Sequence, residues 1–356
     1  MARKKRSRLT LKKSTKNKEH KAPPDGLTEA QFKALKSVFG SFIVTDGDGQ
    51  PHEFKLNNTA FIVPYQEVPS DDLPLEDHWI GRIREIRANT SEDVWVKVQW
   101  YWSPQEVAEV IKSFNPEHCG KKEKLFSDNY DIVSSQCFSD LVLMKRYDER
   151  DLEQPQLEDD DWFYRYNFEY TARRIIPKVA TITCVCKTPY IPGSDEILHF
   201  CPRPGCRTAH HQSCLLERGL VEDVSEDRYR RLIETWPEVG ATDTVESVVE
   251  GPSRKRRKGT PSSTDGCPVM IEDLDPLESF PRGLLDIAKQ QIVKGTHAGG
   301  IVGNLAAVTA ARNIIFRALT GDGIVPDDWM VEIDMPSLDI PWKLPGVICP
   351  HCGSPI

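Results

Sequence analysis

The chain has 356 residues, of which 39% are hydrophobic and 28% are charged, and it contains 26 prolines. This length exceeds one ordinary hydrophobic core, so we expect two or three folded units joined by irregular segments. No run of about 18 apolar residues occurs, and no apolar stretch follows the basic N-terminus. We therefore expect no transmembrane helix, no secretory signal peptide and no membrane partner.

Charge is divided unevenly along the chain. Residues 1–24 contain ten Lys and Arg residues and one acid, Glu19, whereas the whole chain has a net charge of -8. We predict a basic disordered tail over residues 1–26, which suits nuclear import or weak contact with nucleic acid; a merely solvated tail is the alternative. The acidic remainder argues against DNA as the main ligand, because sequence-independent DNA affinity depends on cations that neutralise phosphates. It favours a basic partner such as a histone tail.

Residues 41–147 have the pattern of short β-strands separated by turns, and a short helix is expected before them, over 28–40. The clearest predicted strands are Thr59–Pro64, Trp79–Ile86 and Val94–Trp102. Alternation along the last strand places Trp100 and Trp102 on one face, and an antiparallel neighbour would bring Trp79 beside them. Three adjacent tryptophans fit either a binding groove or a buried β core.

Residues 215–344 differ in pattern from the segments on either side. They predict helices over 215–237 and 283–319, the second broken at a pair of glycines, with a flexible polar segment at 241–266 between them. This segment contains the basic run Arg254–Lys258, a second candidate import signal. The helical part offers a docking surface for another protein, such as a corepressor; the alternative is a simple extension of the core.

Eight Cys and His residues have the spacings of metal ligands. They are Cys184-x-Cys186, Cys201-x4-Cys206, His211-x2-Cys214 and Cys349-x2-Cys352. Four thiolate or imidazole ligands make one tetrahedral site, so eight predict two structural Zn²⁺ ions, with no open position for a catalytic water. His210 is an alternative to His211, but the spacing to Cys214 favours His211. The remaining cysteines lack partners in sequence and are expected to be plain thiols: Cys119, Cys137 and Cys267.

The ligand order, with four Cys, one His and three Cys, resembles the PHD finger, a cross-braced zinc module. The resemblance implies one ion on Cys184, Cys186, His211 and Cys214, and a second ion on Cys201, Cys206, Cys349 and Cys352. A RING-type ubiquitin ligase is the competing interpretation, but its His usually stands earlier in the order. The sequence departs from the PHD pattern in the 134 residues that precede the last Cys pair. The alternative is that this pair binds nothing or a separate metal.

A second resemblance covers about residues 59–174 and is to the BAH domain. It is carried by WIGRI at 79–83, VQWYWSPQE at 98–106, KLFSDNYD at 124–131 and WFYRY at 162–166. With the PHD start at 183–190, the chain resembles plant and fungal BAH–PHD proteins, which read trimethyl-lysine on histone H3, notably H3K27me3, in Polycomb-type repression. The resemblance implies a methyl-lysine cage of Trp79, Trp100 and Trp102. It also implies histone-tail contacts from Asn129, which replaces the usual His, and from Asp131.

We therefore expect an α+β multidomain chain. The expected units are a mainly β BAH domain at 41–178, a PHD finger at 180–214 plus 345–356, and a mostly helical insertion at 215–344. The expected function is that of a nuclear, chromatin-binding histone reader. The sequence contains no Gly-rich phosphate loop, GxSxG or HExxH motif, so we expect no enzyme activity. The PHD itself has Ala209 where readers of methylated H3 lysine 4 usually carry an aromatic residue. The alternative function is a methyl-independent scaffold that recruits a corepressor.

Overall fold

The computed structural model describes residues 26–45, 49–63, 74–91, 93–178, 184–222, 231–232, 277, 280–321, 324–338, 340 and 344–356. Within these ranges, no helix has the length and apolar character needed to cross a membrane. The predicted basic tail and the basic run Arg254–Lys258 lie outside the described residues.

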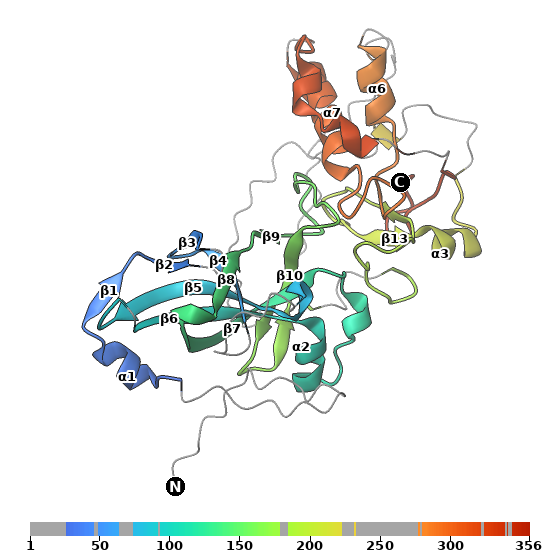
Figure 1. Ribbon diagram of the computed structural model, residues 1–356. Helices are drawn as coiled ribbons and strands as arrows, with labels where there is room; N and C mark the ends of the chain where they lie inside the picture. Colours follow the sequence, from blue (N-terminus) through green and yellow to red (C-terminus); the bar gives the residue numbers. More distant parts are fainter. Residues whose placement is uncertain are drawn as a thin grey trace, which may run out of the picture.

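A large sheet dominates the first half of the chain (Figure 1). Its strands are β1 (Ser37–Phe39), β4 (Thr59–Ile62), β5 (Trp79–Ala88), β6 (Val94–Trp102), β7 (Glu123–Ser134), β8 (Phe138–Leu141), β9 (Met144–Arg146), β10 (Trp162–Glu169) and β11 (Arg174–Ile176). The order is β11-β10-β7-β6-β5-β4-β8, with β1 paired to β5 and β9 paired to β10. A separate hairpin is formed by β2 (Ser41–Thr45) and β3 (Pro51–Lys55).

Short helices connect these strands. They are α1 (Glu29–Ala34), η1 (Leu75–Asp77), α2 (Pro104–Val110), η2 (Pro116–His118) and η3 (Ser135–Cys137). Helix α2 begins directly after β6 because Ser103 caps it: the Ser103 hydroxyl accepts from the Glu106 backbone N–H, and the Glu106 carboxylate accepts from the Ser103 backbone N–H. This capping box fixes the direction in which the chain leaves the strand that carries two of the expected cage residues.

The main core lies on the face of the sheet that the even-numbered residues of β6 share. Val96, Val98, Trp100 and Trp102 all belong to it, as the alternation in the sequence predicts. Gly81 pairs with Trp100 in the β5–β6 register. A Cβ at Gly81 would lie 2.8 Å from Ile62 Cδ1 and 3.2 Å from the Trp100 ring, so a side chain here would force these neighbours to shift.

The expected helix over 28–40 is wrong in its second half. Helix α1 ends at Ala34 because Leu35 adopts extended backbone angles, and β1 then pairs with β5, with Val38 opposite Arg87. Pairing with a long strand outweighs the helical pattern here, as tertiary contacts often override weak local propensity. Strands β4, β5 and β6 lie where the sequence predicts them.

The second half of the chain holds a smaller sheet and a helical pair, drawn in the upper part of Figure 1. The elements are β12 (Leu198–Phe200), β13 (Ala209–His211), α3 (Gln212–Glu217), α6 (Arg282–Ala288), β14 (Val293–Lys294), α7 (Leu305–Thr320), η5 (Trp329–Glu332) and η6 (Met335–Leu338). Strand β14 comes from the insertion but pairs with β12. The predicted helix over 283–319 is therefore two helices, α6 and α7, with β14 between them.

One buried ion-pair cluster joins the large sheet to the second half of the chain. Arg165 on β10 donates to Glu123 of β7 through Nε at 2.8 Å and to Glu149 through Nη1 at 2.5 Å. It also donates to the backbone carbonyls of His118 and Tyr190, both at 3.0 Å. Burial works to lower the pKa of Arg165, but the nearby carboxylates raise it well above its usual value. The guanidinium therefore stays charged and holds four separate segments together.

Lys294 adds a second buried contact between the two halves. Its Nζ lies 3.1 Å from the Glu149 carbonyl oxygen and 3.3 Å from the Tyr147 hydroxyl, and it sits 4.8 Å from the centre of the Phe200 ring. Burial lowers the pKa of Lys294 to about 8. This lysine belongs to β14, so the insertion contacts the segment after β9 as well as β12.

The Arg165 cluster gives a direct stability prediction. Replacing Arg165 by Met leaves Glu123 and Glu149 buried without their cation, which should lower the free energy of unfolding by about 3–5 kcal/mol. Urea denaturation of the full chain would measure the loss. Arg174→Met is the matched control, because the Arg174–Glu169 pair is on the surface and its removal should leave stability almost unchanged. Equal stability of the two variants would contradict a joining role for Arg165.

Candidate functional site

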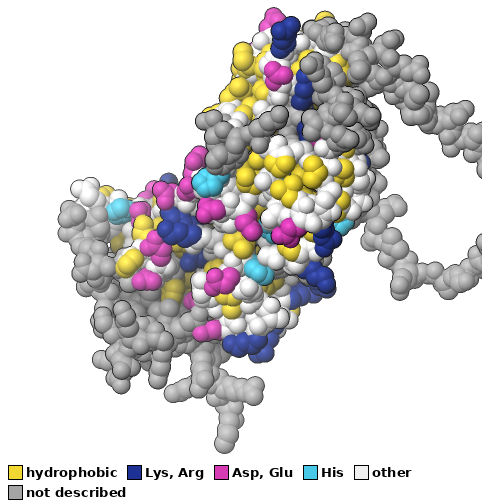
Figure 2. Space-filling model, turned by 90° about the vertical axis from the view of Figure 1, so that its right-hand side faces the viewer, with side chains coloured by type: hydrophobic (Ala, Val, Ile, Leu, Met, Phe, Trp, Pro, Cys, Tyr) yellow, Lys and Arg dark blue, Asp and Glu magenta, His cyan; other side chains and the backbone are white. Residues whose placement is uncertain are grey.

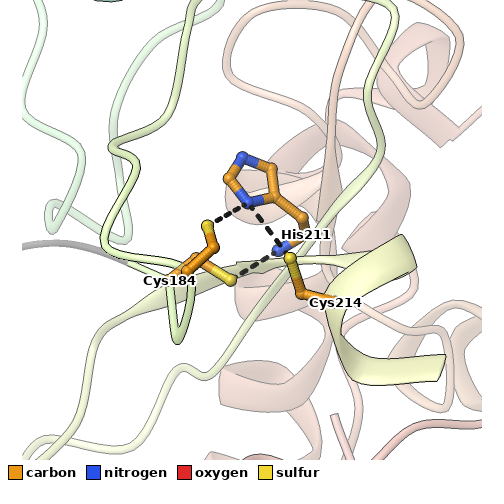
Figure 3. Close-up of side chains that lie close together, drawn as sticks. Cys184, His211 and Cys214 are labelled. Atoms are coloured by element: carbon orange, nitrogen blue, oxygen red, sulfur yellow. Dashed lines mark hydrogen bonds between the residues drawn. The ribbon is translucent and has the colours of Figure 1, made fainter. Parts of the chain in front are cut away.

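The first Cys/His cluster consists of Cys184, Cys186, His211 and Cys214, whose ligand atoms all lie within 4.8 Å of one another. Figure 3 shows Cys184 and Cys214 directed toward His211. The Nδ1 atom of His211 is 3.3 Å from Cys186 Sγ and 4.0 Å from Cys214 Sγ. Zn–S bonds of about 2.3 Å and Zn–N bonds of about 2.0 Å put neighbouring ligand atoms of a tetrahedral site about 3.5 Å apart. The spacing therefore fits a metal ion bound through Nδ1.

A carboxylate lies behind the His211 ring. The Oε2 atom of Glu196 is 3.3 Å from His211 Nε2, the ring nitrogen that faces away from the cysteines. Carboxylates in this position orient metal-bound imidazoles and raise their basicity. His210, the alternative ligand, is fully buried and its Nε2 contacts the Thr208 hydroxyl at 3.1 Å. The structure thus brings His211, and not His210, into the cluster.

The second cluster consists of Cys201, Cys206, Cys349 and Cys352, again within 4.8 Å. The Cys201–Cys352 and Cys206–Cys349 sulfur distances are 3.6 Å and 3.7 Å. These values agree with the edge of about 3.8 Å of a tetrahedron with four Zn–S bonds. The distant C-terminal pair therefore joins Cys201 and Cys206, as the resemblance to a cross-braced module implies. An antiparallel bridge between Val221 and Val347 brings the two ends of the insertion together just before this pair.

Three tight turns support the two clusters. The residue directly after the second Cys of each Cys pair has a positive φ: Lys187 at 66°, Arg207 at 46° and Gly353 at 69°. The Lys187 N–H donates to the Cys184 carbonyl at 2.8 Å, and the Gly353 N–H donates to the Cys349 carbonyl at 2.9 Å. Lys187 and Arg207 adopt a conformation that costs a non-glycine residue roughly 1–2 kcal/mol. Bound metal would offset this cost, because it holds both sulfurs of each turn.

The expected cage residues lie together but are unequally exposed. The Trp79 and Trp100 rings meet edge to face at 5.8 Å, and Trp102 packs against Phe168 and Tyr170. Trp100 is 1% exposed and Trp102 is 6% exposed, whereas Trp79 is only half-buried. This conformation therefore contains no open three-sided cage, because the shared face of β6 points into the core. Of the three rings, Trp79 has the largest exposed share.

The indole N–H groups of these three tryptophans lack hydrogen-bond acceptors among the described residues. The Nε1 atoms of Trp79, Trp100 and Trp102 are all buried without a hydrogen-bond partner among the described residues. Buried Trp N–H groups normally find an acceptor, since an unsatisfied donor costs about 1–3 kcal/mol. The cluster is therefore less fully stabilised than a core of aliphatic residues would be.

The expected tail contacts lie on β7, next to β6. Asp131 stands opposite Val98 in the register, is half-buried, and accepts a hydrogen bond from the Ile132 backbone N–H at 3.0 Å. Burial raises the pKa of Asp131. The Asn129 backbone N–H donates to the Ser127 hydroxyl. Both residues remain predictions as histone contacts.

A cavity beside Trp79 was not expected from the sequence. It has a volume of about 510 Å³ and is lined by η1, the beginnings of β5 and α2, η2, β7 and Trp162. A sequence signal does exist, since Glu76 and Asp77 stand directly before the strand that begins with Trp79. Most of the other lining residues are scattered between positions 101 and 162, so no local sequence pattern predicts that they share a cavity.

Metal content tests the cross-braced arrangement. Cys349→Ser should lower the zinc content of the full chain from two ions to one and destabilise it, because structural zinc contributes folding free energy. Native mass spectrometry would count the ions. Cys119→Ser serves as the control, since Cys119 lies in neither cluster, and it should retain two. Two ions in the Cys349→Ser protein would show that the C-terminal pair is not a ligand pair.

Comparison with known proteins gives two curated relatives. The chain is 24% identical over 140 residues to the chromatin remodeling protein EBS of Arabidopsis thaliana, a match that covers 38% of this chain and 55% of that protein. It is 24% identical over 143 residues to the chromatin remodeling protein SHL of Arabidopsis thaliana, covering 40% of this chain and 59% of that protein. The matches thus span little more than half the length of these relatives.

Among solved structures, the BAH domain of yeast Rsc2 overlaps 38% of this chain and 53% of its own, with a TM-score of 0.26 and 11% identity. No protein-family model matches the chain. A mainly β domain followed by two Cys/His clusters, together with the two plant relatives, fits the BAH–PHD family of chromatin proteins, at low sequence identity.

Proposed function

We propose that this protein is a nuclear histone reader whose BAH-like domain binds the histone H3 tail and recognises trimethyl-lysine, with H3K27me3 as the first candidate mark and transcriptional repression as the outcome. The observation that carries the proposal is the position of Trp79. Its half-buried ring stands edge-on against Trp100 and forms part of the wall of a cavity. A partly exposed indole ring can attract a quaternary ammonium, and here a second indole stands behind it.

Binding in this way requires a movement of side chains. A trimethylammonium group that contacts Trp79, Trp100 and Trp102 together must enter between rings that are now packed. Rotation of Trp79 is the least costly opening, since it is the only one of the three that is not fully buried. The unpaired indole N–H groups weaken the closed packing and make such an opening easier.

Charge supports a basic partner. The chain has a net charge of -8 in spite of its basic N-terminal segment. On the face drawn in Figure 2, Asp and Glu side chains are interspersed with Lys and Arg, and no continuous basic surface is visible. The net negative charge of the chain makes DNA a poor match, since DNA is held chiefly through its phosphates. A lysine- and arginine-rich histone tail is the better match.

The zinc module acts in this proposal as a brace. Ala209 is buried at the position where an aromatic reader residue is expected, and β13, which contains it, pairs with β12, which also pairs with the insertion strand β14. All four positions on each metal would be filled by the chain, which leaves none for a catalytic water. The module is thus suited to structure and docking, and we propose no enzyme activity for the chain.

A methyl-independent scaffold is the second candidate. The insertion exposes apolar side chains on η5 and at the start of η6, with Met330 at 55%, Val331 at 85% and Met335 at 47%. Exposed apolar clusters of this kind often mark protein–protein contacts. A corepressor bound at this surface would act independently of the tryptophans.

Calorimetric titration of the zinc-loaded full chain with H3 peptides around lysine 27, carrying no or three methyl groups, tests the proposal. The trimethyl peptide should bind more tightly, and Trp79→Ala should cost about 1–2 kcal/mol of that binding free energy, whereas Trp79→Tyr should retain most of it. Trp95→Ala is a suitable control, because Trp95 lies on the opposite face of β6. Equal affinity for both peptides would leave the scaffold as the better proposal.

A further inference from the structure

The cavity beside Trp79 has walls of two kinds. Aromatic rings line it through Trp79, Tyr101 and Trp162, and carboxylates line it through Glu76, Asp77, Glu106, Glu117 and Glu123. The cavity measures about 510 Å³, which is ample for one long side chain. Its position is fixed by rigid elements, since the Ser103 cap holds the start of α2 and Arg165 holds the start of β7.

Two of these carboxylates already form hydrogen bonds or ion pairs within the protein. Glu106 accepts hydrogen bonds from Ser103, and Glu123 is paired with Arg165. Across the described part of the chain, Glu76, Asp77 and Glu117 make no ion pair. These three stand on η1 and η2, at the rim of the cavity. The cavity therefore presents free negative charge to an incoming group.

A cation of the protein itself already lies in the cavity. The ammonium of Lys124 sits 5.0 Å from the centre of the Trp162 ring and forms no ion pair or hydrogen bond with the described residues. Burial lowers the pKa of Lys124, and the fields of Glu106, Asp77 and Glu76 act in the opposite direction. Its neighbour Lys122 also reaches Trp162, but is bound to Asp160 at 2.7 Å. Among the described residues, the half-buried Lys124 ammonium therefore has a ring face and the fields of distant acids as its surroundings.

We propose that this cavity binds an unmodified basic side chain, lysine or arginine, of the same tail, and that Lys124 competes with it for the site. The choice of a histone tail as the source rests on the proposed function. Trp79 forms part of the cavity wall and of the tryptophan cluster, so a side chain one or two residues from a methyl-lysine at Trp79 would reach the cavity in an extended peptide.

Removing the rim acids and removing the Lys124 ammonium should change ligand affinity in opposite directions. Removing the rim acids, as in the double variant Glu76→Gln with Asp77→Asn, takes away attraction for the guest cation. Lys124→Met keeps an unbranched apolar stem but removes the competing ammonium. Glu76 and Asp77 are exposed, and Lys124 forms no ion pair with the residues that the structure describes, so neither change breaks a buried ion pair described here. A merely structural role for Lys124 would not predict tighter ligand binding by Lys124→Met.

The experiment titrates the zinc-loaded full chain with unmodified and trimethylated H3 peptides around lysine 27, and with versions in which each flanking basic residue is replaced by alanine in turn. The acid double variant should bind the unaltered peptides roughly threefold to fivefold more weakly, and Lys124→Met should bind them more tightly by a similar factor. One alanine peptide should lose both effects. Raising the salt concentration should shrink both effects, because the rim charges are screened. Glu53→Gln with Asp140→Asn is the matched control, since both acids are exposed and lie outside the cavity.

Weaker or unchanged binding by Lys124→Met, or equal effects on every alanine peptide, would overturn the proposal, as would a failure of all peptides to bind. Its failure is distinguishable from failure of the proposed function. If the trimethyl peptide binds more tightly than the unmodified one, but the acid double variant and Lys124→Met do not change affinity in opposite directions, the cavity is not a binding site and the proposed reader function stands. If the two variants change affinity in opposite directions but both peptides bind equally well, the proposed recognition of trimethyl-lysine fails and the cavity remains a binding site.

Discussion

A buried guanidinium, that of Arg165, is the centre of the polar contacts that join the two halves of this protein. Arg165 reaches β7 through Glu123, the segment after β9 through Glu149, and the zinc module through the Tyr190 carbonyl. Each of these groups would be costly to bury alone, and together they satisfy most of the hydrogen-bond donors of one side chain. The arrangement is demanding in geometry, so it fixes the orientation of the β domain against the module more strictly than apolar packing would.

The same constraint positions the candidate binding surfaces. Glu123 begins β7, and β7 carries both the cavity lysine and the two expected tail contacts. Arg165 also lies on β10, the strand that opens with the cavity residue Trp162. The walls of the cavity are therefore set by a network that extends into the zinc module. Buried polar contacts thus connect the zinc module to the walls of the cavity.

Much of the architecture could be predicted from the sequence. The strand Val94–Trp102 agrees in both bounds, because nine alternating residues leave little ambiguity in period. The two Cys/His sets agree in membership with the set that the resemblance to a PHD finger implies; spacing alone picks out the pairs, but it does not say that Cys349 and Cys352 join Cys201 and Cys206 across 134 residues. Strand β1 could not be predicted, since its pairing with β5 depends on a partner about fifty residues away. Trp100 and Trp102 illustrate a different limit: a core and a groove use the same face of a strand, so alternation alone cannot separate them.

The order of the metal ligands along the chain has a consequence for biosynthesis. The first cluster has all four ligands once Cys214 has been made, but the second waits for Cys349 and Cys352, which follow the 134-residue insertion. At translation rates of about 5–20 residues per second, this interval is on the order of ten seconds. During that time Cys201 and Cys206 lack the second Cys pair of their cluster. A chain interrupted within the insertion has only half of this ligand set.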